Sequence, residues 1–412
     1  MTRPVEDDVG QRWRRHAVVL AFGTFAVGTD AFVIAGVIPS IGRSLHVSVA
    51  AAGQLVTVFS IAYAVLSPVL AALTSRLSRR TVLVAALGIF AVGNVATALA
   101  PSYALVLLAR IIAGAGAAMF TPNAGATAAV LAGPARRGRA IAIVTVGLTS
   151  SVVLGAPLGT AIGNAFGWQA TMWFVTALAV MVAPIIAFQL PDIKLPFTAG
   201  LRQRLAPLTD RRVLLVLVGT LLAFIGVFLP YTYISAVYSP VIAANHGNRL
   251  AILLLVYGLV GTAGNLVAGR LADRSTPSRV VIGATLVLTA VFLLTPLARE
   301  SFLTALPAVA IFGFASWSLT GPQQNRVIAL ASPGTESLVV SLNAAVLYLA
   351  ISLSSVIGAI GLAVLGPVSL PLLAAVFTAL AATFTWLTTR PNRPTVTPTA
   401  ESVVTKAALA CR

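Results

Sequence analysis

The stretch AVVLAFGTFAVGTDAFVIAGVIPSI, residues 17–41, carries a single ionisable side chain, Asp30, within a long apolar run. A helix needs about 20 predominantly apolar residues to cross a bilayer, so this stretch predicts a membrane span. Similar runs follow along the chain, and together they begin near Ala17, Ala50, Thr81, Ser102, Ala140, Trp168, Arg212, Arg249, Val280, Phe302, Ser337 and Leu370. Because the runs are continuous and do not alternate every second residue, we predict twelve membrane-spanning helices and no transmembrane barrel.

Composition supports a membrane protein. Hydrophobic residues make up 58% of the 412 residues and charged residues 9%. A soluble domain carries about 25% charged residues, so the chain is not an ordinary water-soluble globule.

Positive charge is concentrated on one set of connections. Of the 27 Lys and Arg residues, 23 fall in the two chain ends and in alternate connections, and Arg110 lies within a run. The opposite connections hold only Arg43, Arg249 and Arg299. Cytoplasmic loops carry the excess of Lys and Arg, so we expect both termini in the cytoplasm, with a bacterial plasma membrane as the location. The net charge of +17 therefore faces a lipid bilayer, and nucleic acid is excluded as a partner.

The basic sequence RWRRH, residues 12–16, could begin a signal peptide, but the apolar run behind it is too long, contains Asp30 and lacks a cleavage-type ending. Cys411 is the only cysteine, so no disulfide framework or thiolate metal site forms within one chain. We expect no cofactor and no metal.

The longest polar connection, PDIKLPFTAGLRQRLAPLTDRR at residues 191–212, divides the runs six and six. We expect five segments: a cytoplasmic tail (1–16), a six-helix bundle (17–190), a cytoplasmic linker (191–211), a second six-helix bundle (212–390) and a second tail (391–412). Both tails are predicted to be flexible.

Two matching connections carry a repeated motif. GRLADR, residues 269–274, lies between the eighth and ninth runs, and AALTSRLSRR, residues 71–80, lies between the second and third. The second-half copy, residues 269–274, retains Asp273 and Arg274; the first-half copy, residues 71–80, retains Arg76, Arg79 and Arg80 but has Ser75 and Ser78 in place of the usual Asp and Gly. Both stretches resemble the loop signature of the major facilitator superfamily. The resemblance implies an all-α membrane protein whose twelve helices form two pseudo-symmetric six-helix bundles, acting as a monomeric transporter.

Two further stretches resemble motifs of drug-proton antiporters in this superfamily. LLARIIAGAGAA, residues 107–118, resembles the fourth-helix motif through Arg110, Gly114 and Gly116, with Ala113 in place of the usual Gln. GLTSSVVLGAPLGTAIG, residues 147–163, resembles the fifth-helix antiporter motif. The match in the fifth helix rests on Gly155, Pro157, Gly159 and Gly163. A further stretch, GTDAFVIAGVIPSI at residues 28–41, resembles the group of chloramphenicol and sugar exporters. The resemblance implies that the motif residues of the loops and of the fourth and fifth helices take part in gating. Close helix packing by glycine and a kink at the proline are the structural alternative.

Asp30 and Arg110 are the two charges stranded inside the spans. Asp30 lies roughly 15 Å below the end of the first span at Ser40, and Arg110 roughly 12 Å below Ser102, so the two could meet. Charges at membrane depth usually have a function. Burial favours a protonated carboxylate and a nearby guanidinium favours the charged form, so movement of Arg110 relative to Asp30 would switch proton affinity. We predict that Asp30 carries the proton; a static pair that only aligns two helices is the alternative. The resembled group often carries its acid one position later, where this chain has Ala31. The side chain of Asp30 therefore points about 100° away, around the helix axis, from the direction of the family's acid.

An apolar pocket with a few polar groups suits a lipophilic small molecule as substrate. Candidate contacts are aromatic, amide and thioether side chains at cavity depth: Phe25, Phe32, Met119, Asn123, Phe228, Tyr231, Tyr233, Tyr257, Asn265, Trp317, Gln323, Asn343 and Tyr348. We expect about a third to line the cavity and the others to be packing or membrane-belt residues.

The function expected from these observations is proton-coupled export of a small, lipophilic, drug-like or antibiotic molecule. Efflux or uptake of a sugar or nucleoside is the second hypothesis, and a receptor or scaffold without transport is the third. No zinc-protease, serine-hydrolase or ATP-binding motif is present in the sequence, so we do not expect an enzyme.

Overall fold

The computed structural model describes residues 4–74, 76–133, 136–193, 206–243, 248–331 and 336–389. These ranges contain helices and no strand. Helices long and apolar enough to cross a membrane are Trp13–Ser44, Val49–Leu73, Arg79–Leu99, Tyr103–Ala132, Arg137–Phe166, Trp168–Gln189, Arg211–Thr232, Arg249–Ala272, Pro277–Ala298, Phe302–Ile328, Leu338–Leu365 and Ser369–Thr389. The prediction of twelve spans is confirmed, and each starts within a few residues of its predicted position.

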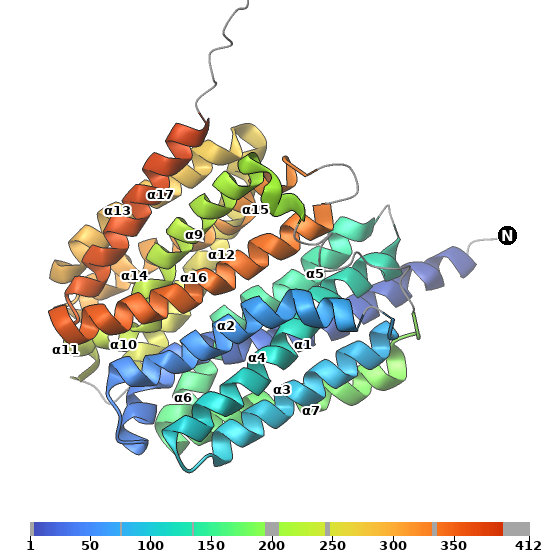
Figure 1. Ribbon diagram of the computed structural model, residues 1–412, viewed down its shortest axis with the longest axis horizontal. Helices are drawn as coiled ribbons and strands as arrows, with labels where there is room; N and C mark the ends of the chain where they lie inside the picture. The colour runs from blue at the N-terminus through green and yellow to red at the C-terminus, as the bar shows by residue number, and fades with distance from the viewer. Residues whose placement is uncertain are drawn as a thin grey trace, which may run out of the picture.

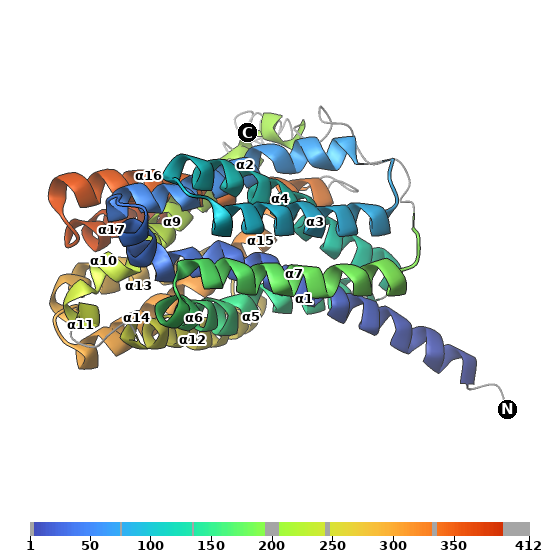
Figure 2. The same ribbon diagram turned by 90° about the horizontal axis from the view of Figure 1, so that it is seen from below.

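The first helix begins earlier than the sequence predicted. α1 covers Pro4–Ser44, and its first turns project away from the bundle (Figure 2). The prediction that residues 1–16 form a flexible tail is therefore wrong from Pro4 onward. Proline at the first helical position and acidic residues in the first turns are both typical of a helix start. Most of the predicted linker, residues 194–205, and all of the carboxyl-terminal tail lie outside the described residues.

The helices form two bundles that lie side by side (Figure 1). The amino-terminal bundle contains α1, α2 (Val49–Leu73), α3 (Arg79–Leu99), α4 (Tyr103–Ala132), α5 (Arg137–Ser150), α6 (Ala156–Phe166) and α7 (Trp168–Gln189). The carboxyl-terminal bundle contains α9 (Arg211–Thr232), α10 (Ile234–Val237), α11 (Ser239–Ala243), α12 (Asn248–Arg274), α13 (Pro277–Ala298), α14 (Phe302–Trp317), α15 (Thr320–Ile328), α16 (Glu336–Leu365) and α17 (Ser369–Thr389). Two-bundle architecture of this kind was predicted and is confirmed.

The fifth span is interrupted near its middle. Between α5 and α6 the chain makes a π-helical turn, Ser151–Gly155, and Pro157 stands in the first turn of α6. Proline has no N–H to donate to the carbonyl four residues before it, so a regular α-helix cannot pass through this point. π-Turns inside helices are a recognised cause of bending and occur often at functional sites.

Glycines bring several helices into close contact. A Cβ at Gly114 would lie 2.7 Å from the Phe59 carbonyl oxygen of α2, and one at Gly155 would lie 2.0 Å from Thr29 Oγ1 of α1. At Gly159 the nearest atom, from Val33, would be 2.5 Å away. These distances support the close-packing interpretation of the motif glycines; a gating role stays a prediction.

The two bundles meet along two helix pairs. α2 packs along α16, and α6 with the π-turn packs against α12. The helices α2, α4, α7, α12, α15 and α17 all end at one end of the molecule, which we call the basic end because its loops are basic. We call the other end the opposite end. Towards the opposite end the Ser355 hydroxyl of α16 donates to the Gly53 carbonyl of α2 at 2.8 Å. The Tyr233 hydroxyl donates to the Ser355 carbonyl, also at 2.8 Å, and its ring fills the space beside Gly53. The bundles are therefore locked together towards the opposite end.

Contact between α3 and α4 provides a test of glycine packing. A Cβ at Gly116 would lie 2.5 Å from the backbone nitrogen of Phe90, whereas a Cβ at Gly125, on the same helix, would meet nothing within 4 Å. We expect Gly116→Ala to destabilise the protein by about 1–3 kcal/mol, because backbone must move to admit the methyl group. Gly125→Ala is the matched control and should not lower the thermal midpoint measured in detergent. Equal midpoints for the two variants would contradict this packing.

Candidate transport site

The two stranded charges form a direct ion pair. Arg110 Nη1 of α4 donates to both carboxylate oxygens of Asp30 on α1, at 2.8 and 2.9 Å. Both side chains are enclosed, with exposures of 1% for Arg110 and 0% for Asp30. The contact predicted from their similar depths is present.

A third helix, α2, supports the guanidinium of Arg110. The Arg110 Cζ atom lies 4.4 Å from the centre of the Phe59 ring of α2, a distance at which a cation is attracted by the ring face. The pair therefore joins α1, α2 and α4, all within the amino-terminal bundle.

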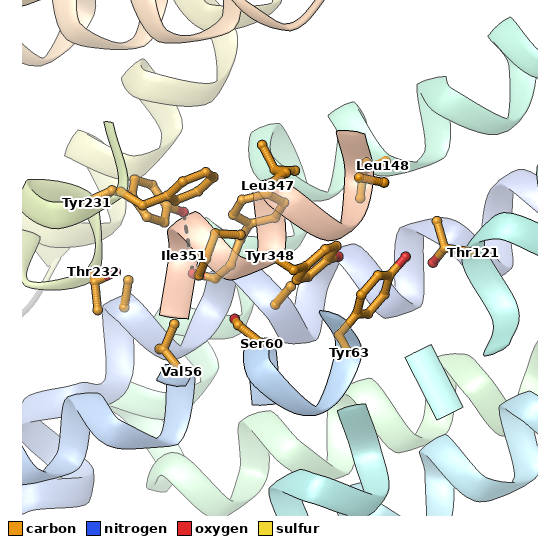
Figure 3. A pocket seen from close by; sticks show the side chains of 15 residues that line it. Val56, Ser60, Tyr63, Thr121, Leu148, Tyr231, Thr232, Leu347, Tyr348 and Ile351 are labelled. Carbon is orange, nitrogen blue, oxygen red and sulfur yellow. Dashed lines mark hydrogen bonds between the residues drawn. The ribbon is translucent and has the colours of Figure 1, made fainter. Parts of the chain in front are cut away.

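A cavity of about 120 Å³ lies beside this pair, between the two bundles. The amino-terminal bundle supplies Ala31, Phe32, Ala35, Val56, Ser60, Tyr63, Thr121 and Leu148, and the carboxyl-terminal bundle supplies Phe228, Tyr231, Thr232, Ala344, Leu347, Tyr348 and Ile351. Figure 3 shows these side chains converging from both bundles. The wall is mainly apolar, with a few hydroxyl groups.

Asp30 itself does not line this cavity. Ala31, the next residue, does, and consecutive residues on a helix point about 100° apart. The one-residue offset noted in the sequence thus turns the carboxylate towards Arg110 and leaves a small apolar side chain facing the cavity.

Aromatic rings dominate the cavity. Phe32 of α1 contacts Tyr231 of α9 edge-on, with ring centres 5.9 Å apart, and lies 6.4 Å from Phe228. The Tyr63 and Tyr348 rings, one from each bundle, are stacked with centres 3.5 Å apart (Figure 3). Flat aromatic surfaces of this kind bind apolar and ring-containing molecules.

Four of the predicted contact residues line the cavity: Phe32, Phe228, Tyr231 and Tyr348. This fraction agrees with the expectation of about a third. Tyr257 and Trp317 form a second layer, since Tyr257 packs on Tyr231 at 5.0 Å and Trp317 on Phe32 at 6.3 Å.

The other candidates lie elsewhere. Tyr233 belongs to the contact towards the opposite end, and Met119 is buried in the core. Asn343 accepts a hydrogen bond from Thr220, at 3.1 Å, and Gln323 accepts one from Arg326. Phe25 and Asn265 are half-buried and do not line this cavity.

Sequence reasoning missed the cavity residues of α2. Tyr63 was not among the candidates although it stacks on Tyr348. A tyrosine in the middle of an apolar run is a signal that would have found it, because its hydroxyl needs a partner or water at membrane depth. The small residues Ala31, Ala35 and Ala344 give no such signal.

The loop motif of the first half serves a structural contact. Arg79 is buried and donates from Nη1 to Asn123 Oδ1 of α4, and its backbone N–H donates to the Ile193 carbonyl at 2.9 Å. Arg76 is exposed and Arg80 is half-buried. In the second copy Arg274 is exposed, while the Asp273 side chain lies outside the described part of the structure.

A cavity shared by two six-helix bundles, with a buried charge pair beside it, is the arrangement found in secondary-transporter folds, whose two halves pack around a central site. The chain belongs to the Major Facilitator Superfamily, whose sequence profile matches residues 20–333 and 216–410. It is thus a multi-pass membrane protein of a transporter family.

Similar proteins carry general names. The chain is 34% identical over 343 residues to YbcL of Bacillus subtilis, an uncharacterized MFS-type transporter, covering 83% of this chain and 87% of that protein. It is 32% identical over 383 residues to the inner membrane transport protein YdhP of Escherichia coli strain K12, covering 92% and 97%. A third relative, the uncharacterized MFS-type transporter YfhI of Bacillus subtilis, is 29% identical over 344 residues, covering 83% and 84%.

The ion pair predicts a characteristic pattern of stability. Arg110→Met leaves Asp30 enclosed without a charged partner, and we expect a loss of about 3–5 kcal/mol. Asp30→Asn/Arg110→Met removes both charges and should recover part of that loss. Thermal unfolding in detergent measures both variants. If the double variant is no more stable than Arg110→Met, the stranded carboxylate is not the source of the loss.

Proposed function

We propose that this chain exports a small, lipophilic, drug-like or antibiotic molecule in exchange for protons. Export would proceed by alternating access in a bacterial inner membrane, with both termini in the cytoplasm. The observation that carries the proposal is the Asp30–Arg110 pair beside an aromatic cavity shared by both bundles.

Asp30 is the only carboxylate within the twelve described spans, so it is the one acidic group available there to carry a proton. Protonation removes the negative charge of Asp30 and turns one of the two oxygens that accept from Arg110 into a hydroxyl donor, which a donor-only guanidinium cannot accept from. With the pair weakened, α1 and α4 are free to shift against each other.

Position on α1 links the proton to the substrate. Asp30 faces Arg110, while Ala31 and Phe32, on another face of the same helix, line the cavity. A movement of α1 that follows protonation therefore changes the cavity wall directly, and a substrate that pushes on this wall acts in turn on the pair. The carboxylate need not touch the substrate.

Cavity size supports a cycle of states. A volume of about 120 Å³ is below the roughly 300–1,000 Å³ of sites for drug-sized ligands. A molecule of that size fits only when the bundles separate. The bundles are locked towards the opposite end in this arrangement, so separation at the basic end is the movement that would admit it.

Orientation rests on the distribution of charge. Within the described residues, the connections rich in Arg lie at the same end of the bundle as the start of α1, which agrees with the expected excess of Arg and Lys on the cytoplasmic side. The name of YdhP, an inner membrane transport protein, supports the choice of membrane.

Replacement of the proposed proton carrier is the first test. Asp30→Asn still accepts a hydrogen bond from Arg110, so the protein should fold but lose transport against a gradient. A panel of antibiotics, sugars and nucleosides is first screened for compounds to which the chain confers resistance in an efflux-deficient bacterium. Transport of these compounds is then measured in membrane vesicles with and without an uncoupler. Asp192→Asn, which changes an exposed carboxylate, is the control. Undiminished uphill transport by Asp30→Asn overturns the assignment.

Replacement of a cavity ring is the second test. Phe228→Ala removes an aromatic face from the cavity, and we expect about a tenfold higher concentration for half-maximal transport. Phe292→Ala removes a buried ring that packs on Phe312 in the same bundle but does not line the cavity, and should leave this concentration unchanged. Matching values for the two variants would place the substrate outside this cavity.

A further inference from the structure

A groove separate from the central cavity lies at the basic end of the carboxyl-terminal bundle. The last turns of α12 and the first turns of α13 form its two sides, and α14 forms its floor. Its volume is about 380 Å³, which is larger than the cavity between the bundles. No residue that lines the groove also lines that cavity.

Small side chains and loose packing between two helices leave this space open. α12 and α13 each pack more extensively on α14 than on one another. Gly283 of α13 lines the groove, and a Cβ at this position would meet nothing within 4 Å. Leu271 of α12 and Val287 of α13 also line it and are 49% and 44% exposed. Both belong to membrane spans, so the groove opens towards lipid and not towards the interior of the bundle.

The mouth of the groove is basic. Arg279, in the first turn of α13, lines it and is exposed. In the part of the chain that the structure describes, no carboxylate lies within ion-pair distance of this arginine. Ser275, directly after α12, donates its hydroxyl proton to the Leu271 carbonyl at 2.7 Å, so its oxygen is left to accept. The mouth therefore offers one cationic donor and one acceptor.

Polarity changes along the groove in one direction. From Arg279 at the mouth to Val287 the helix rises roughly 12 Å towards the middle of the bilayer, and the wall between them is apolar. A glycerophospholipid has the same order of chemistry, with a phosphate at the membrane surface and an acyl chain below it. A free anion would leave the apolar part empty, and a neutral apolar molecule would not use the arginine.

The charge must supply the selectivity of such a site. An acyl chain gains little by leaving the bilayer for an apolar groove, because lipid tails are as apolar as the side chains of the wall. A guanidinium–phosphate contact is a charge-assisted hydrogen bond, and basic pockets between membrane-spanning helices bind anionic headgroups. The groove holds one chain in place, and Arg279 selects the headgroup.

We propose that this groove binds one anionic glycerophospholipid. An acyl chain lies along Gly283 between α12 and α13, and the phosphate lies on the Arg279 guanidinium. The Ser275 oxygen accepts from a headgroup hydroxyl of the kind that phosphatidylglycerol carries. This site is separate from the proposed exchange of substrate and protons and does not rest on it.

The test is photolabelling of the purified, delipidated full-length chain in detergent by a phosphatidylglycerol with a diazirine in one acyl chain. The label should appear on peptides of α12 and α13. Unlabelled phosphatidylglycerol should compete at about fivefold lower concentration than phosphatidylcholine with the same chains, as expected for one arginine near a phosphate. Glycerol 3-phosphate, which has the charge but no chain, should not compete.

A charge variant tests the headgroup contact. Arg279→Gln should make phosphatidylglycerol and phosphatidylcholine compete equally, because the cation that distinguishes them is gone. Arg212→Gln changes an exposed arginine in the first turn of α9, at the same end of the bundle, and should keep the difference. Loss of the difference in both variants would show a general effect of basic charge and overturn the proposal.

A filling variant tests the groove itself. Gly283→Leu places its side chain in open space, so the thermal midpoint should not fall, yet labelling of α12 and α13 should be lost. Gly88→Leu, at an equally open position on α3, is the control and should be labelled as the parent is. Full labelling of Gly283→Leu, equal competition by the two lipids in the parent chain, or competition by glycerol 3-phosphate overturns the proposal.

Discussion

The ion pair between Asp30 and Arg110 sets the arrangement of the amino-terminal bundle. Two charges that would be unfavourable alone in an apolar interior hold α1 against α4, with Phe59 of α2 beneath the guanidinium. Because α1 also forms one wall of the cavity, the position of that wall depends on the pair. The surrounding glycine contacts act in the same direction, since they leave α1 little freedom to rotate against the fifth span.

Much of this arrangement follows from the sequence. The apolar runs predicted the twelve spans, because the bilayer fixes the length of a span. The similar depths of Asp30 and Arg110 predicted their contact, because the rise of a helix per residue is constant. The direction in which each side chain points was harder to predict than the position of the helices. The sequence identified Phe32 and Tyr231 as cavity residues but also Tyr233, which packs beside Gly53 instead. Tyr231 lies in the last turn of α9 and Tyr233 in the turn that follows it, and only the packing of both bundles determines which side chain faces the cavity and which faces the interface. Tyr63 was missed although its place in the middle of an apolar run was a usable signal.

Each bundle has, at its basic end, a buried arginine that donates a hydrogen bond to a side-chain amide. In the amino-terminal bundle Arg79 donates to the amide oxygen of Asn123, which follows Pro122 on α4. In the carboxyl-terminal bundle Arg326 donates to the amide oxygen of Gln323, which follows Pro322 on α15. Each bundle thus places a buried arginine–amide pair at the end where the loops are already basic.

The interface between the bundles contains two kinds of contact. The Tyr63 and Tyr348 rings are stacked across it, with centres 3.5 Å apart, and dispersion contributes to such a contact. The Ser355–Gly53 contact is directional and fixes one atom against another. Separation of the bundles at the opposite end therefore requires the Ser355–Gly53 hydrogen bond to break, and neither residue belongs to the Asp30–Arg110 pair.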